Sequence, residues 1–142
     1  KRLIQINDLQ NNIILLGRHP ATDMPTFFHE ADALLVSLKS NHILDKTIPG
    51  KVQSYLNSNK PVLAVLSGEG ASVIKNAGSG FVSKPGDADS LATSIKHLAL
   101  LSNEERQAMG ISGYAYAQEH FKKEKILDEL EFWMLQLVNG TV

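Results

Sequence analysis

The sequence lacks cysteine, and it lacks any long uninterrupted run of apolar residues. Without cysteine, the chain forms no disulfide and no thiolate metal site, which fits a reducing compartment. A membrane-spanning helix needs about 20 consecutive apolar residues, and no segment approaches that length. Lys1 and Arg2 lead into only a short apolar stretch, so no secretory signal peptide is predicted. A cytoplasmic protein is therefore expected.

The sequence also lacks an excess of charge of either sign. It has 14 Lys plus Arg against 15 Asp plus Glu, a formal net charge of −1. Binding to nucleic acid needs a basic face, so no nucleic-acid partner is expected. The histidines show no metal-ligand spacing, and no metal is expected. There is no nucleophile elbow, phosphate loop or dinucleotide fingerprint either.

What the sequence does contain is a regular alternation of short apolar runs and helical segments. Hydrophobic residues make up 43% of the 142, enough for the core of one domain. Strands are predicted over residues 12–17, 33–38, 61–66 and 80–84. Helices are predicted over residues 25–32, 49–58, 69–77, 87–101, from about Ser102, and 121–137. This alternation predicts an α/β fold with a parallel sheet flanked by helices and right-handed crossovers.

The helices in the last third of the chain carry more specific signals. After the fourth predicted strand, Leu91, Ile95 and Leu98 recur at helical spacing, and this face is expected to pack inward. Ser102 and Glu105 have the spacing of a capping box, in which each side chain pairs with a backbone amide near the other. A new helix is therefore expected to begin there.

The long polar loop that follows the second predicted strand is the predicted ligand site. In open parallel sheets, ligands bind beyond the carboxyl ends of the strands. Residues 39–48 run into a helix that opens at Pro49 and carries Gly50 and Lys51. Free amides and the helix dipole there favour an anion, and Lys51 and Lys39 add charge, so a phosphate or diphosphate is predicted. Ordinary helix capping with two solvated lysines is the alternative.

Other loops at the same edge are residues 18–24, 67–70 and 85–87. In the loop at 67–70, two glycines flank Glu69 just after a strand. Its carboxylate could accept hydrogen bonds from sugar or ribose hydroxyls. It could equally be a first-turn glutamate that favours the helix dipole.

Several segments, taken in order, are similar to one enzyme family. They are NIILLGRHPATDM (12–24), FFHEADALLVSL (27–38), TIPGKVQSYLNSNKPVLA (47–64) and GFVSKPGD (80–87). Together they resemble the C-terminal half of GT-B-fold retaining glycosyltransferases (group 1, family 4), which use nucleotide-sugar donors. SLK at 37–39 and TIP at 47–49 look most like bacterial surface-polysaccharide transferases. The resemblance implies that residues 1–142 are a Rossmann-like, incomplete C-terminal domain of a GT-B fold.

The resemblance also implies where the donor binds. In that family, the turn after the strand equivalent to residues 12–17 holds the nucleobase, which assigns Arg18 and His19 to it. The helix start at Pro49 lies by the diphosphate, which assigns Gly50 and Lys51 to that group.

The sugar and ribose contacts implied by the family are less complete in this sequence. The Gly-Glu loop lies near the sugar, which suggests Glu69. The family's sugar-contacting glutamate has Asp45 as its nearest counterpart, and the ribose-binding glutamate falls at Ser54, which hydrogen-bonds more weakly. Together with Lys39, these residues complete the predicted donor site.

The resemblance implies a reaction for the intact enzyme. It transfers a sugar with retention from a UDP- or GDP-linked donor to a glycan or polyprenyl-linked acceptor, in bacterial polysaccharide synthesis such as that of O-antigen. Negative charge grows on the departing diphosphate, and the helix start with Lys51 would stabilise it while Asp45 orients the sugar. Neither a metal nor a cofactor is expected.

The family's N-terminal acceptor domain and the first strand of its donor domain would precede Lys1. The fragment alone is therefore expected to be inactive, and peripheral contact with the inner membrane face would belong mostly to the missing half. The alternatives are a stand-alone α/β binding module and a GT-B-type sugar-nucleotide epimerase. The epimerase would need more acid–base residues than the chain offers.

The final helix has two interpretations. The favoured one is that most of its apolar face packs on the sheet, with Phe121, Phe132 and Trp133 as core residues. In the resembled family the last helix reaches back to the N-terminal domain. Phe132 and Trp133 would then lie exposed in this chain and promote self-association.

Overall fold

The fold is built on a short parallel sheet. The computed structural model describes residues 1–140. Its strands lie in the order β1-β2-β3, with bounds Leu34–Ser37, Val62–Val65 and Gly80–Ser83. Both neighbouring pairs are parallel, and Val36 lies opposite Ala64, which lies opposite Val82. The predicted parallel α/β architecture and the strands predicted from residue 33 onward are confirmed.

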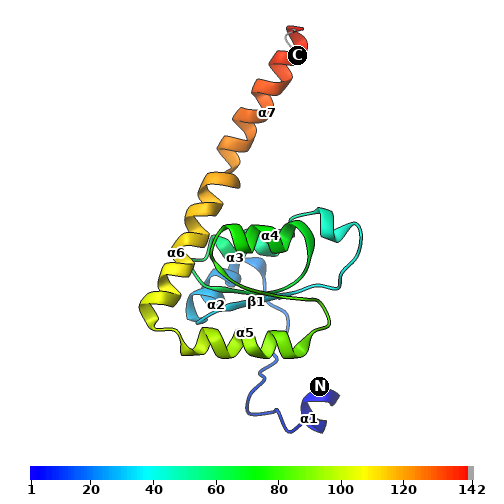
Figure 1. Ribbon diagram of the computed structural model, residues 1–142, viewed down its shortest axis with the longest axis vertical. Coiled ribbons are helices and arrows are strands. Elements are labelled where there is room, and N and C mark those ends of the chain that lie inside the picture. Colours follow the sequence, from blue (N-terminus) through cyan, green and yellow to red (C-terminus); the bar gives the residue numbers. More distant parts are fainter. Residues whose placement is uncertain (141–142) are drawn as a thin grey trace.

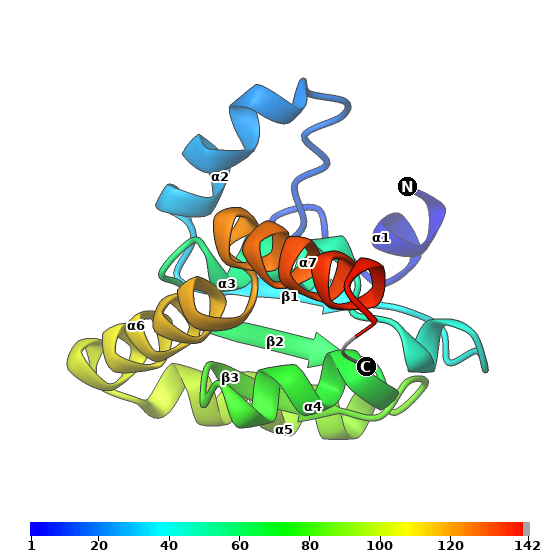
Figure 2. The ribbon, with the colours of Figure 1, turned by 90° about the horizontal axis from the view of Figure 1, so that it is seen from above.

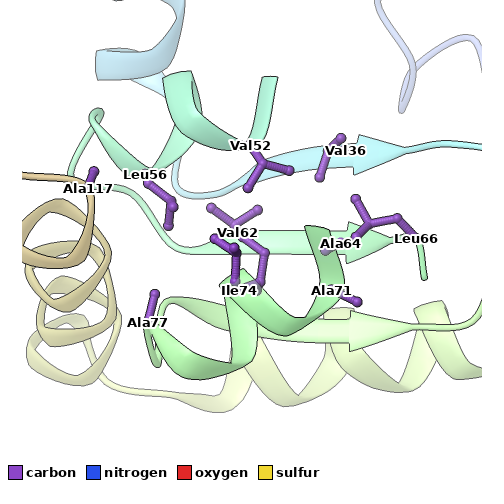
Figure 3. Close-up of a cluster of buried hydrophobic side chains, with 11 residues drawn as sticks. Val36, Val52, Leu56, Val62, Ala64, Leu66, Ala71, Ile74, Ala77 and Ala117 are labelled. Carbon is purple, nitrogen blue, oxygen red and sulfur yellow. The ribbon is translucent and has the colours of Figure 1, made fainter. Parts of the chain in front are cut away.

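Helices cover the two faces of this sheet. The crossover helices α3 (Gly50–Leu56) and α4 (Gly68–Asn76) lie on one face, and α5 (Ala88–Leu100) lies on the other (Figure 1). Because both faces are covered, every residue of β2 is buried. In Figure 3, side chains of α3 and α4 point toward Val62 and Ala64 of β2.

The position of α3 is fixed by its apolar face. Val52 and Leu56 are fully buried against the sheet and α4. Burying such a side chain completely contributes roughly 2 kcal/mol. These contacts therefore fix the start of α3 at the carboxyl edge of the sheet.

The strand predicted over residues 12–17 is wrong. After α1 (Arg2–Ile6), residues 13–20 have no regular structure, and Ile14 is 79% exposed. A strand forms only where a neighbour supplies its hydrogen bonds, and β1 is an edge strand with no partner on its outer side among residues 1–140. The apolar composition of this segment is strand-like, but the described residues offer it no partner.

The irregular segment leads into a short turn and helix. The 3₁₀ turn Ala21–Asp23 precedes α2 (Met24–Glu30), which has Pro25 in its first turn, as predicted. Phe28 of α2 meets Tyr55 of α3 edge to face, with ring centroids 5.2 Å apart. This contact joins α2 to α3 beside the core, against which Tyr55 also packs.

Helix α5 is rotated from the predicted orientation. Leu98 is buried and Leu91 half-buried, but Ile95 is 45% exposed, so the prediction that Ile95 faces inward is wrong. The hydroxyls of Ser83 and Ser94 lie 3.1 Å apart in a hydrogen bond between β3 and α5. This polar pair turns Ser94 toward the sheet in place of Ile95.

Helix α6 (Asn103–His120) begins at the predicted capping box. The amide of Glu105 donates to the Ser102 hydroxyl at 3.1 Å, and the amide of Ser102 donates to the Glu105 carboxylate at 2.7 Å. Ala117 of α6 joins the core beside Leu56. The prediction of a helix starting at Ser102 is confirmed.

The last helix, α7 (Lys123–Val138), extends away from the rest of the molecule (Figure 1). None of its residues is buried, and Phe132 and Trp133 are 54% and 57% exposed. The prediction that its apolar face packs on the sheet is therefore wrong, because α3, α4 and α5 already cover the sheet. The half-buried Phe121, which precedes α7, does pack against the core.

Candidate functional site

The loop after β1 folds back toward the neighbouring strand. The side-chain oxygen of Asn41 accepts from the amide of Ile43 at 2.8 Å, and its carbonyl accepts from the amide of Asp45 at 2.9 Å. These bonds lead into the 3₁₀ turn η2 (Leu44–Lys46). Figure 2 shows this loop at the arrowhead end of the strands, which is the carboxyl edge of the sheet. The loop therefore occupies the edge at which parallel sheets bind ligands.

Asp45 joins this loop to the turn after β2. One carboxylate oxygen accepts from the Ser67 hydroxyl at 2.7 Å, and the other accepts from the Ser40 hydroxyl at 2.9 Å. These two hydrogen bonds, from Ser67 first and Ser40 second, lower the pKa of Asp45 below its ordinary value of 3.8. Asp45 is therefore a fixed, ionised carboxylate at neutral pH.

The backbone of this turn packs on η2 without any intervening side chain. Gly68 has φ of +68°, and a Cβ placed on it would lie 1.9 Å from the carbonyl oxygen of Asp45. A Cβ on Gly70 would lie 3.0 Å from the ring of Pro49. Gly68 thus lets the start of α4 lie against η2, and Gly70 lets it lie against Pro49 at the start of α3.

The predicted anion-binding features lie at the same edge. Pro49 has extended backbone geometry and precedes Gly50, the first residue of α3, and the helix start has no side-chain cap. The first amides of a helix have no partner within the helix. Gly50, Lys51 and Lys39 are all exposed. The arrangement leaves amides and positive charge available to an anion beside the Asp45 carboxylate.

Ser54 lies one turn further along α3. Its hydroxyl donates to the carbonyl of Gly50 at 3.1 Å, so only its lone pairs remain available for a ligand. It lines a hollow of about 470 Å³ between α2 and α3. The other lining residues are the apolar Ala21, Met24, Pro25 and Phe28 and the polar His29, Asn57 and Ser58, of which His29 and Ser58 also line a hollow at the amino edge of the sheet. The hollow offers an apolar wall with hydrogen-bonding atoms at its rim.

Arg18 and His19 lie in the irregular segment that leads to α2. The His19 ring bonds the carbonyl of Leu16 at 2.9 Å and lies edge-on to Phe27, with centroids 4.8 Å apart. Arg18 is exposed. These contacts hold the turn against α2, whose start lines the hollow that contains Ser54, while Asp45 and Lys51 form a separate group at the loop after β1.

Glu69 occupies the first turn of α4, directly after the contact between Gly68 and Asp45. It is exposed. Its position suits both interpretations of the sequence, a ligand for hydroxyl groups and a favourable charge at a helix start. Within residues 1–140, no three histidine, aspartate or glutamate side chains gather to hold a metal ion.

The two serines that hold Asp45 were not predicted as individual site residues. Each entered only as a member of a predicted loop, Ser67 in residues 67–70 and Ser40 in residues 39–48. Little in the sequence indicates their role, since Ser67 is simply a small polar residue two positions after a buried strand. The pairing depends on where η2 places Asp45, 22 residues away in the chain.

A larger hollow of about 590 Å³ lies at the opposite, amino edge of the sheet, near Lys60 and Arg106. The Lys60 ammonium donates to the carbonyl of His29 at 2.7 Å. The Arg106 guanidinium donates to the carbonyl of Leu101 at 2.6 Å and also bonds the side chain of Asn103. These cations hold the structure together, so the carboxyl edge is the better candidate site.

Comparisons with known proteins agree with this architecture. No curated protein sequence matches the chain significantly. Its fold is similar to sucrose-phosphate synthase from Thermosynechococcus elongatus, with a TM-score of 0.81 and 18% identity. The match covers 98% of this chain and 33% of that one, so the Rossmann-like sheet matches a fragment of a GT-B glycosyltransferase. The sequence family described as Glycosyl transferases group 1 matches residues 1–116. The chain therefore belongs to the group 1 glycosyl transferases.

Proposed function

We propose that this chain is the donor-binding part of a retaining glycosyltransferase that uses a UDP- or GDP-linked sugar. The observation that supports this best is the joining of the β1 loop to the start of α4 through Asp45. That contact sets an ionised carboxylate beside an uncapped helix start with an exposed lysine. A nucleotide sugar needs both kinds of group, cationic donors for its diphosphate and acceptors for its hydroxyls.

The diphosphate would bind at the start of α3. Negative charge grows on this group as the glycosidic bond breaks. Amides of Gly50 and Lys51, together with the charges of Lys51 and Lys39, would stabilise that charge most in the transition state. In this proposal no metal is needed to neutralise the leaving group.

The sugar would lie toward Asp45 and Glu69. Carboxylates accept hydrogen bonds from hydroxyl groups, and Asp45 is already oriented by two serines. The nucleoside would lie toward the hollow between α2 and α3, with a ribose hydroxyl on Ser54 and the base near Arg18 and His19.

The acceptor is proposed to be a glycan or polyprenyl-linked glycan in bacterial polysaccharide synthesis. This rests on the resemblance of residues 37–39 and 47–49 to surface-polysaccharide transferases. The chain spans about a third of the length of the similar structure, so acceptor binding is assigned to a further domain. Among residues 1–140, no helix is long and apolar enough to cross a membrane.

Nucleotide titration of the chain tests this proposal. We expect UDP or GDP to bind more tightly than the matching nucleoside, and Lys51→Ala to weaken diphosphate binding about tenfold, as loss of one charge-assisted contact would. Nucleoside affinity should stay within twofold. Isothermal calorimetry and NMR shift mapping would measure both affinities.

The matched control is Lys123→Ala, which removes an exposed lysine from α7. It should change neither affinity. Equal weakening of nucleoside and diphosphate by Lys51→Ala would reject the role of Lys51. Failure of both diphosphates to bind at millimolar concentration would reject the donor site and favour a stand-alone binding module.

A further inference from the structure

We propose that Ser67 is a positioning residue, which holds the Asp45 carboxylate in the orientation that receives the hydroxyls of the donor sugar. The inference rests on the proposed donor function. Neither the family match nor the residues predicted from sequence assigns a role to Ser67.

Ser67 connects Asp45 to the buried central strand of the sheet. It follows β2, in which every residue is buried, and the intervening Leu66 is only 4% exposed. The bond from its hydroxyl to Asp45 is half-buried and 2.7 Å long. Ser40, by contrast, lies in the same exposed loop as Asp45. Ser67 therefore fixes the carboxylate relative to the sheet, whereas Ser40 fixes it only within its own loop.

Gly68 allows the loop to lie directly against the turn that carries Ser67. Its backbone lies against the carbonyl of Asp45, at a distance that leaves no space for a Cβ. The backbone of Asp45 thus packs directly on that of Gly68 while its side chain accepts the hydrogen bond of the Ser67 hydroxyl. The two contacts together restrict both the place and the direction of the carboxylate.

The fixed carboxylate keeps capacity for a ligand. A carboxylate has about four lone-pair sites, and the two serine hydroxyls use one on each oxygen. Asp45 is half-buried, so part of it still faces solvent. A sugar hydroxyl that meets an already oriented acceptor loses less free energy to side-chain ordering, which favours the bound sugar.

Measuring the Asp45 pKa tests the positioning role without any ligand. The titratable and charged groups on the elements around Asp45 are Lys39, His42 and Lys46 in its own loop, Glu69 and Lys75 on α4, and Lys51 on α3. The Ser67→Ala variant retains them all. Because the Ser67 hydroxyl stabilises the ionised form, we expect Ser67→Ala to raise the pKa of Asp45 in a carboxyl-carbon NMR titration.

Binding measurements test the effect on the sugar. With UDP-glucose and GDP-mannose as probes, Ser67→Ala should weaken binding of the nucleotide sugar that the unaltered chain prefers by about tenfold. Binding of the corresponding diphosphate without sugar should change by less than about twofold, because Ser67 acts through Asp45 alone. Ser67→Thr retains a hydroxyl and should restore both the pKa and the affinity.

The matched control is Ser112→Ala, which also removes one half-buried hydroxyl bond, at 2.6 Å to the carbonyl of Ala77, but far along the chain from Asp45. It should leave the pKa of Asp45 and both affinities unchanged. It thereby separates a local effect of Ser67 from a general loss of stability.

The outcomes separate this inference from the proposed function. An unchanged Asp45 pKa in Ser67→Ala, or equal weakening of diphosphate and nucleotide sugar, would overturn the positioning role while leaving the donor site intact. A raised pKa in a chain that binds no nucleotide would overturn the donor site and with it the sugar role of Ser67.

Discussion

The two edges of the sheet both carry positive side chains, but they use them differently. At the amino edge, Lys60 and Arg106 donate to backbone carbonyls and lie half-buried. At the carboxyl edge, Lys39 and Lys51 are exposed, and no hydrogen bond or ion pair engages their side chains within residues 1–140. The larger hollow lies at the amino edge, yet its cations are already engaged. Hollow size alone is therefore a poor guide to a ligand site.

The carboxylates differ between the edges as well. Asp45 at the carboxyl edge accepts from two serines and joins two loops. Asp32 at the amino edge is exposed and lines the hollow near Lys60. Hydrogen bonds across separate loops fix a side chain in advance of binding, which is what a site for a polar ligand requires. The cations of the amino edge are engaged in structural hydrogen bonds, whereas the carboxyl edge carries the proposed binding groups for the diphosphate and the sugar.

The largest expected effect comes from breaking the contact that builds the carboxyl edge. Gly68→Ala would place a Cβ 1.9 Å from the Asp45 carbonyl in a backbone with φ of +68°. The strained backbone and the clash together should lower the free energy of unfolding by about 3 kcal/mol. Urea denaturation monitored by circular dichroism would measure it.

Gly86→Ala is the matched control for that change. Gly86 also has positive φ, +83°, but nothing lies within 4 Å of its Cβ position. It should lose only the strain, about 1 kcal/mol. If both variants lost similar amounts of unfolding free energy, η2 would be able to move away from α4 at little cost. That result would contradict a preformed site.

A smaller effect is expected at the amino edge. Arg106→Ala removes donors from the carbonyls of Leu98 and Leu101, and should lower the free energy of unfolding by about 2 kcal/mol. Affinity for UDP or GDP should stay the same. Arg2→Ala, in the exposed first helix, is the control and should change neither quantity. Weaker nucleotide binding by Arg106→Ala would indicate that the nucleotide binds at the amino edge and would contradict the proposed site at the carboxyl edge.

The parts of the fold that could be predicted are those in which local pattern and packing agree. Residues 61–66 and 12–17 are both short apolar runs, yet the first is the buried centre of the sheet and the second is exposed. Composition is the same kind of signal in both, but a strand also needs a neighbouring strand. Whether a segment has a neighbouring strand depends on the whole fold, and a local sequence pattern does not contain that information.

The candidate site follows the same division. The start of α3 with Gly50 and Lys51 could be predicted, because a proline, a glycine and an apolar helical face lie in consecutive positions. The bond between Ser67 and Asp45 could not, because it depends on the fold of the loop between β1 and α3. Ile95 shows the same limit, since the inward face of α5 carries Ser94, whose hydrogen-bond partner Ser83 lies on another element.

The smallest expected effect is in the pH dependence of stability. The pKa of Asp45 in the folded chain lies below its ordinary value of 3.8, because the hydroxyls of Ser67 and Ser40 stabilise the carboxylate. Such a group stabilises the folded state above its ordinary pKa, and this contribution is lost as the pH falls through the lowered pKa. Asp45→Asn should therefore be less stable than the unaltered chain above about pH 5, with the difference shrinking toward acid.

Urea denaturation at a series of pH values would measure this difference. Asp128→Asn, in the exposed helix α7, is the control and should follow the unaltered chain throughout. A difference for Asp45→Asn that stays constant from neutral to acid pH would show that the serines hold the side chain without regard to its charge. The negative charge of Asp45 would then contribute nothing to the order of the carboxyl edge. The two edges would differ in their packing and hydrogen bonds but not in the electrostatic stabilisation of a carboxylate.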